Sequence, residues 1–356
     1  MKQVRKQYLV SLGLSVLIAM LLGAALMLLT GHNPIEAYGI MFSGALGSMT
    51  DLGDTLYKST QLAITGLATA VTSQSGIFNV GGEGQMYLGA LASAWLGALL
   101  KGTSPWLAIP ACLCIAGLAG ALWALIPALL KVKLKINEVI TTILMNTIAL
   151  KFCSYMSNGP LKTTERGINQ GTQSISKAFR FASIDLFSGS NLTTAVVLIV
   201  FIILLVWYMM NRTTTGFEMK LTGQNESFAR FSGLSAARLA VLGMLISGAM
   251  CGLLGMFETF GVQRRFRMDF SSEFYFDGML VAMIMQYKPL GIVLMSFFFG
   301  ILMTGGQRMQ YIGVSSELVE IIQSFIIFLM AAESGLLGKV SRALTGGAAK
   351  KQEVKT

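Results

Sequence analysis

Apolar residues form long unbroken runs along this chain, and polar residues are confined mostly to the stretches between them. Several runs reach the roughly 20 residues that a helix needs to cross the hydrocarbon core of a bilayer. The pattern predicts ten membrane-spanning helices, at about residues 8–30, 55–74, 83–100, 104–130, 137–157, 191–210, 236–262, 272–287, 289–304 and 316–336. Three of these segments (55–74, 272–287 and 289–304) are short or rich in glycine and polar residues, which favours re-entrant or broken helices.

The composition agrees with this class. Of the 356 residues, 54% are hydrophobic and only 12% are charged, whereas soluble domains carry about 25% charged residues. We therefore expect an all-α polytopic membrane protein in which residues 1–356 form a single transmembrane domain.

The distribution of Lys and Arg predicts the orientation. Lys2, Arg5 and Lys6 precede the first apolar run, and such flanks are typical of the cytoplasmic side. Ten crossings then place both termini in the cytoplasm, together with most of the 27 Lys and Arg residues. The sequence RRFR at 264–267 is an exception, because it falls outside. Orientation and contact with lipid headgroups account for the net charge of +10, so we expect no nucleic-acid partner.

Two loops are long enough to matter for function. The polar loop at about 158–190 lies outside and is expected to form an exposed cap, and the loop at about 211–235 lies in the cytoplasm. In the second loop the pattern predicts a short helix over 226–231, with Asn225 as its N-cap. Two interpretations stay open for this loop: a piece that fits into a cleft on a motor subunit, or an ordinary solvated connection.

The sequence GIFNVGGEGQ, residues 76–85, interrupts two apolar helices with polar residues. Polar backbone and a carboxylate near bilayer depth are costly unless protein or a water-filled cavity surrounds them. This break therefore suggests a transport site. A second polar position, Asn146, lies within the run at 137–157, where it either bonds a neighbouring helix or lines a pathway.

Several segments taken together resemble a known family. They read GIFNVGGEGQMYLGALASA, NEVITTILMN, TGFEMKLTGQNESFARFSGLSAARL, SGAMCGLLGMFE and MIMQYKPLGIVLMSFFFGIL. They are similar to the permease subunits of ABC importers of the branched-chain amino acid/ribose-type superfamily, and most similar to its nucleoside-uptake branch. That branch has a motif close to G-x-F-N-[IV]-G-x-E-G-Q. The resemblance runs in order from about residue 60 to 335.

The resemblance implies a set of partners in a bacterial cytoplasmic membrane. They are an ABC ATPase subunit, a second permease subunit (homologous or identical) and an extracytoplasmic substrate-binding lipoprotein. This chain has no P-loop motif, so ATP and Mg are expected on the ATPase, and we expect no cofactor, catalytic residue or metal site here. The expected solute is a nucleoside, with riboflavin, a sugar or another small polar solute as alternatives. An ion-coupled secondary transporter is the remote alternative.

The resemblance also suggests roles for particular residues. The pathway candidates are Phe78, Asn79, Glu83, Gln85 and Asn146; Glu83 is either a solute contact or an acceptor for backbone N–H groups at the break. The candidates for coupling to the ATPase are Gly223, Asn225, Glu226, Arg230 and Gly233. Arg264, Arg265 and Arg267 are either docking residues for the binding protein or contacts to lipid headgroups.

Overall fold

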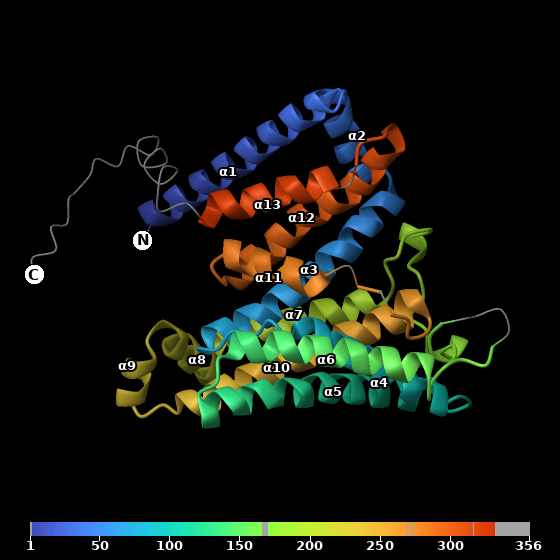
Figure 1. The fold of residues 1–356 in the computed structure, drawn as a ribbon, viewed down its shortest axis with the longest axis vertical. Helices are drawn as coiled ribbons and strands as arrows, with labels where there is room; N and C mark the ends of the chain where they lie inside the picture. Colours follow the sequence, from blue (N-terminus) through green and yellow to red (C-terminus); the bar gives the residue numbers. More distant parts are fainter. Residues whose placement is uncertain (1, 166–169, 269, 272, 316, 332–356) are drawn as a thin grey trace, which may run out of the picture. The chain divides into compact units, whose positions relative to one another are not determined.

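The computed structural model describes residues 2–165, 170–268, 270–271, 273–315 and 317–331, and helices dominate this part of the chain (Figure 1). The described residues fall into two compact units, Met1–Gly47 with Ile301–Thr356, and Ser48–Gly300. The single transmembrane domain over residues 1–356 stays a prediction, because two compact units can belong to one membrane domain.

The first unit contains α1 (Lys2–Leu29), α2 (Pro34–Leu46) and α13 (Glu317–Ala331). Asn33 begins α2 by accepting the backbone N–H of Ile35. Helices α1 and α13 lie side by side because Gly23 leaves room for Ile322, whose Cδ1 would be only 2.5 Å from an added Cβ.

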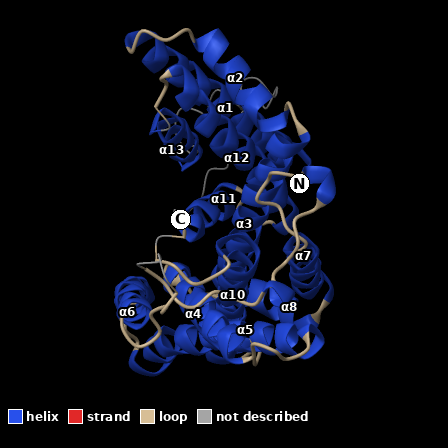
Figure 2. Cartoon of the chain, turned by 90° about the vertical axis from the view of Figure 1, so that its right-hand side faces the viewer, coloured by secondary structure: helices blue, strands red, loops and turns tan. Residues whose placement is uncertain are grey.

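The second unit contains the elements that concern function. They are α3 (Met49–Gln74), α4 (Gly82–Leu99), α5 (Pro105–Leu134), α6 (Glu138–Asn158), α7 (Ala195–Arg212), α8 (Thr214–Gln224), α9 (Glu226–Phe231), α10 (Ala236–Glu258) and α11 (Phe274–Ile284). Residues of α12 (Pro289–Met309) belong to both units. Helices α4, α5, α6 and α10 run alongside one another (Figures 1 and 2).

Small residues bring α10 into close contact with its neighbours. A Cβ on Gly248 would lie 2.5 Å from the carbonyl oxygen of Gly120 in α5, and one on Gly255 would lie 2.1 Å from that of Met86 in α4. Membrane helices associate largely through such close backbone packing, because lipid provides little hydrophobic drive between them. Helix α10 is therefore a central element of this unit.

Helix α3 is the polar element of the second unit. Ser, Thr and Gln recur along it, yet every residue from Gln61 to Thr72 is buried. Its hydroxyl groups donate mainly to carbonyl oxygens one turn earlier, as Thr65 does to Gln61 and Thr69 does to Thr65. A helix this polar is stable in a membrane only when protein surrounds it.

In the part of the chain that the structure describes, each of the ten predicted segments overlaps a helix, and six helices are long and apolar enough to cross a membrane. These six are Val10–Leu29, Pro105–Leu134, Glu138–Asn158, Ala195–Arg212, Ala236–Gln263 and Pro289–Ile312. Residues 316 and 332–336 of the last segment lie outside the described residues. Helix α11 has 11 residues, and its re-entrant or broken character stays a prediction. A broken helix was the wrong expectation for α3 and α12, which are continuous over 26 and 21 residues.

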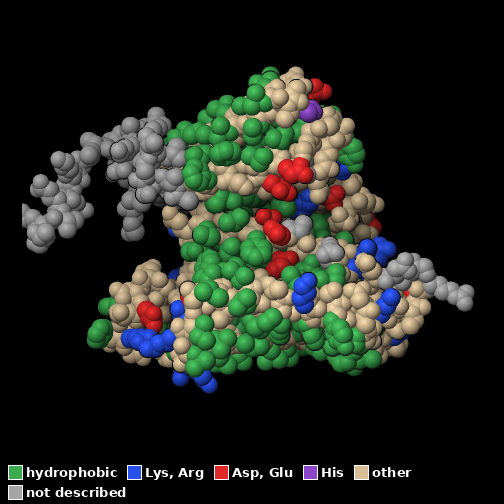
Figure 3. Space-filling model, viewed as in Figure 1, with side chains coloured by type: hydrophobic (Ala, Val, Ile, Leu, Met, Phe, Trp, Pro, Cys, Tyr) green, Lys and Arg blue, Asp and Glu red, His purple; other side chains and the backbone are tan. Residues whose placement is uncertain are grey.

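The surface along α5 and α6 has the character of a lipid-facing side. Hydrophobic side chains cover its middle, and Lys and Arg gather toward its two ends (Figure 3). Exposed apolar residues here include Leu118 and Leu122 of α5 and Ile140, Ile143 and Ile148 of α6.

Candidate functional site

The break between α3 and α4 forms a closed network of hydrogen bonds. Asn79 is fully buried, and its Nδ2 donates to Gln85 Oε1 (3.0 Å) and to Ser247 Oγ of α10 (3.1 Å). Its Oδ1 accepts the backbone N–H of Gly81 (2.9 Å) and Nε2 of Gln85 (3.2 Å). The side chains of Asn79 and Gln85 are therefore hydrogen-bonded to each other, and Asn79 also accepts a backbone N–H of the turn that begins α4.

Asn146 of α6 fastens the break from a neighbouring helix. Its Nδ2 donates to the carbonyl oxygen of Val80 (2.8 Å), and its Oδ1 accepts the N–H of Gly84 (2.8 Å). Two backbone groups that the break leaves without helical partners are satisfied in this way. Of the two interpretations of Asn146, bonding to a neighbouring segment is the one that the geometry supports.

Glu83 and Tyr275 join the break to the start of α11. The Tyr275 hydroxyl donates to the carbonyl oxygen of Asn79 (2.7 Å), and the Tyr275 N–H points to Glu83 Oε2 (3.3 Å). Glu83 thus accepts a backbone N–H, as one of its two interpretations expected, although the N–H belongs to α11. The Tyr275 ring lies against Gly82, where an added Cβ would lie 2.0 Å from it.

Four of the five pathway candidates are therefore brought together and buried: Asn79, Glu83, Gln85 and Asn146. Phe78 is half-buried beside them. Their contact with a solute stays a prediction.

The loop at about 211–235 contains the predicted helix. Helix α9 spans Glu226–Phe231, and Asn225 Oδ1 accepts the Phe228 N–H (2.9 Å), which confirms the N-cap. Arg230 pairs with Glu226 one turn earlier (2.6 Å), with both side chains more than half exposed. Gly233 ends the helix at a φ of +81°, a conformation that other residues rarely adopt. Helix α8 before it was not predicted.

Helix α8 connects this loop to the break. A Cβ on Gly223 would lie 2.6 Å from the Gln74 carbonyl oxygen at the end of α3, so the two backbones are in direct contact there. Gly76, at a φ of +76°, faces Thr222 from the other side of the contact. A movement of α8 therefore reaches the start of the break directly.

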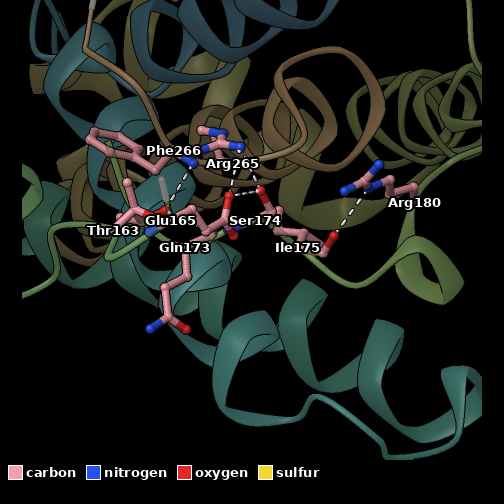
Figure 4. Close-up of polar contacts among 9 residues, drawn as sticks. Thr163, Glu165, Gln173, Ser174, Ile175, Arg180, Arg265 and Phe266 are labelled. Atoms are coloured by element: carbon pink, nitrogen blue, oxygen red, sulfur yellow. Dashed lines mark hydrogen bonds and ion pairs between the residues drawn. The ribbon is translucent and has the colours of Figure 1, made fainter. Parts of the chain in front are cut away.

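The cap is fastened to the segment that follows α10 (Figure 4). Arg265 Nη2 donates to Glu165 Oε2 (3.1 Å) and to Ser174 Oγ (2.6 Å), and Ser174 in turn donates to Glu165 through its N–H and hydroxyl group. These bonds from Ser174, with the Arg265 charge, hold the pKa of Glu165 below its ordinary value. Arg265 is thus engaged within the chain, whereas Arg264 and Arg267 are exposed. Docking by any of the three stays a prediction.

A second polar cluster lies between α3 and α10, and the sequence patterns did not single it out. The Tyr57 hydroxyl donates to Glu258 Oε2 (2.6 Å), and Gln61 Nε2 donates to Glu258 Oε1. We call Tyr57, Gln61 and Glu258 the outer cluster. Glu258 within the apolar run at 236–262 was the available signal, since an ionisable residue inside a membrane segment is a functional candidate by default.

The outer cluster borders a small cavity and an irregular helix. The cavity has a volume of about 10 Å³, and Phe257, Thr193 and Ile199 also line it. Directly after Glu258 the backbone turns into a π-helix over Thr259–Gln263. Short π-helical turns within α-helices occur frequently at functional sites.

A larger cavity of about 560 Å³ lies between α4, α5 and α6. Its walls are apolar, with Leu91, Trp95, Trp123 and Phe152 among them. Walls of this kind suit lipid chains or another apolar surface and provide few partners for a polar solute.

The family that matches this chain and three of the relatives most similar to it are all described as transport permeases. The family described as branched-chain amino acid transport system / permease component matches residues 52–331. A nucleoside ABC transporter permease protein of Lactococcus lactis is 32% identical over 90% of both chains. A guanosine ABC transporter permease protein of Bacillus subtilis is 30% identical over 92% of this chain and 95% of its own. A glucose ABC transporter permease protein of Haloferax volcanii is 32% identical over 90% and 86%.

The same three organisms each have a second relative of this chain, at 22% to 23% identity. A probable riboflavin import permease of Treponema pallidum is 26% identical. No solved structure gives a significant match.

Proposed function

The chain belongs to the family of branched-chain amino acid transport system permease components, and from this premise we propose that it is the membrane-spanning permease subunit of an ABC importer for nucleosides. The observation that carries the proposal is the similarity to nucleoside and guanosine permeases over about nine-tenths of each chain. Glucose and riboflavin remain the alternative solutes, because permeases named for them are also relatives.

The proposed complex contains a second permease that is homologous to this chain but not identical to it. Support comes from the pairing of relatives: each of three organisms has one permease at 30% to 32% identity and another at 22% to 23%. Two ABC ATPase subunits would bind ATP and Mg at the cytoplasmic face, and a substrate-binding lipoprotein would deliver the solute outside.

In this proposal the chain crosses a bacterial cytoplasmic membrane ten times, with both termini in the cytoplasm. Four of the six clearly apolar helices, α1, α5, α6 and α7, are buried along less than half of their length and would face lipid or other subunits, whereas α10 and α12 are mostly buried. Helices α3, α4, α11 and α13 would supply the remaining crossings, with buried α3 in the interior of the bundle.

ATP hydrolysis would reach the pathway through α9 and α8. Helix α9 would sit in a cleft of the ATPase, with Arg230 and the exposed Phe231 on its surface. Because α8 touches the end of α3 at Gly223, a displacement of α9 would be passed to the break. The break would then act as a rigid inner gate whose polar atoms hold its own backbone.

The binding protein would dock on the cap side. Arg264 and Arg267 are exposed there, and acidic residues on the partner would be attracted to them. Arg265 would act indirectly by fixing the cap through Glu165.

Uptake by the reconstituted complex tests the function. Proteoliposomes containing both permeases and the ATPase, with the binding protein outside and ATP inside, would be given labelled guanosine, uridine, glucose or riboflavin in turn. We expect nucleosides to accumulate and the other two solutes to stay near background. Accumulation of glucose or riboflavin without nucleosides would replace the proposed solute, and accumulation driven by an ion gradient without ATP would contradict the importer class.

A further inference from the structure

We propose that the outer cluster is a contact site for the solute in the translocation pathway, and that it recognises neutral solutes through their N–H and O–H groups. The proposal rests on the proposed function, and it assigns recognition to residues other than those of the GIFNVGGEGQ break.

The orientation of the Gln61 amide is fixed by its neighbour. Glu258 offers only acceptors unless it is protonated, so the amide turns its nitrogen toward the carboxyl group. The amide oxygen is thereby left over. It is buried and has no hydrogen-bond partner, on a residue that is only 1% exposed.

A buried amide oxygen without a partner is costly, by roughly 1–3 kcal/mol. Asn79, a similar side chain in the same unit, has partners for both of its polar atoms. Gln74 near the end of α3 also has a buried amide oxygen without a partner. Gln61 lines the cavity beside Glu258, and a ligand there with a hydrogen-bond donor would remove the cost.

The chemistry of the cluster defines what it accepts. The Gln61 oxygen and the remaining lone pairs of Glu258 are acceptors, and Phe257 adds an aromatic wall to the same cavity. A nucleoside offers amide, amine and hydroxyl donors together with a flat ring. A nucleotide would also bring phosphate oxygens, which are acceptors and would face acceptors. The site thus favours nucleosides over nucleotides.

The position of the cluster suits the early part of transport. Glu258 lies at the end of α10, Tyr57 lies two turns from the start of α3, and Thr193 at the end of the cap loop lines the cavity. The space is water-sized in this conformation, so the site must open for the solute. The π-helix over Thr259–Gln263 and the cap bonds to it, such as Phe181 N–H to the Phe260 carbonyl oxygen (3.2 Å), connect such an opening to the cap.

The test compares the single variant Glu258→Gln with a double variant in which the residues at positions 61 and 258 are exchanged. Glu258→Gln replaces one of the two acceptor oxygens of Glu258 with an NH2 group. The double variant Gln61→Glu/Glu258→Gln keeps one amide and one carboxylate in the cluster, so that the hydrogen bond between them is retained with donor and acceptor on opposite helices. Ser59→Ala is the matched control, because Ser59 is buried on the same helix but bonds its own backbone at Thr55. The thermal midpoint and the KM and maximal rate of guanosine uptake would be measured on each reconstituted complex.

We expect Glu258→Gln to fold and to lose on the order of tenfold or more in the ratio of maximal rate to KM, since bonds to charged groups contribute about that much. The double variant should recover the wild-type midpoint but not the uptake, and Ser59→Ala should leave both unchanged. Recovery of both midpoint and uptake in the double variant would make the cluster purely structural and overturn the proposal.

The solute is a separate question from the site. If the wild-type complex carries glucose or riboflavin in place of guanosine, the same variants are measured with that solute. Loss of its uptake in the variants would support the site while the nucleoside assignment fails. Unchanged uptake of the wild-type solute in Glu258→Gln would overturn the site whatever the solute is.

Discussion

The GIFNVGGEGQ break and the outer cluster are both polar groups of one helical unit, but their hydrogen bonds differ. At the break, side chains from α6 and α11 satisfy backbone groups that the interruption leaves unpaired, and Ser247 of α10 accepts a hydrogen bond from the Asn79 side chain. In the outer cluster three side chains satisfy one another only in part, and the Gln61 oxygen is left without a partner. A saturated network holds a shape, whereas an unsaturated one has capacity for a ligand.

The comparison assigns different work to the two regions. In the proposed importer the break, which lies against α8, would follow the ATPase, and the outer cluster, whose cavity is also lined by Thr193, would meet the solute. A polar residue in a membrane protein is thus informative about function only when its bonds have been traced.

Asn146→Ala is expected to have the largest effect on the break. It leaves the carbonyl oxygen of Val80 and the N–H of Gly84 buried and unpaired, at roughly 1–3 kcal/mol each, so we expect a loss of about 2–6 kcal/mol in stability. Thermal unfolding of the solubilised complex measures it. Thr147→Ala, exposed on the same helix, should change little; an equal loss in both variants would contradict the account of the break.

Gly223→Ala tests the contact between α8 and α3. The added Cβ would lie 2.6 Å from the Gln74 oxygen, which costs about 1–3 kcal/mol or forces α8 away. We expect uptake to fall several-fold while the ATPase remains bound, as measured by co-purification and transport. Gly233→Ala is the comparison, because it strains φ without a close contact. If both variants lose uptake equally, the contact at Gly223 has no special role.

Arg230→Glu tests the surface of α9. An exposed ion pair contributes little to folding, about 0.3–0.5 kcal/mol within a helix, so the chain should still insert. Transport-coupled ATP hydrolysis should fall several-fold if Arg230 faces the ATPase. The double variant Glu226→Arg/Arg230→Glu restores the pair but not the surface charge. Full recovery of ATP hydrolysis in the double variant would mean that Arg230 acts only through its ion pair with Glu226.

The bonds that hold the cap should weaken in acid, and this is the smallest of the four expected effects. Because the folded pKa of Glu165 is lowered, its stabilising bonds are present at neutral pH and are lost as the pH falls through that lowered pKa. The side chain is exposed, so the contribution is at most about 1 kcal/mol. The protection of the Ser174 amide against hydrogen exchange, taken relative to the intrinsic rate at each pH, should fall in acid, and Glu165→Gln should remove this dependence. A pH response that survives in the variant would assign it to another group.

Much of the helical framework was predictable because it depends on local sequence. The apolar runs located the ten segments, and Asn225 located α9 through N-cap chemistry that acts over three residues. The break was found for the same reason, since its glycines and polar residues are contiguous.

The outer cluster was not predictable in this way. Tyr57 and Glu258 are 201 residues apart, and only the packing of α3 against α10 brings them together. The continuity of α3 was missed because its polar residues read as a weak membrane segment, whereas burial and backbone hydrogen bonds stabilise it. The partners of Asn79 and Glu83 likewise required the positions of α10 and α11.

The most direct test compares two isosteric changes, Glu83→Gln at the break and Glu258→Gln in the outer cluster, by the KM for guanosine uptake in proteoliposomes. The account predicts an unchanged KM for Glu83→Gln, because an amide oxygen still accepts the Tyr275 N–H. It predicts a several-fold higher KM for Glu258→Gln in a variant that still folds. A raised KM for Glu83→Gln with a normal KM for Glu258→Gln would contradict it.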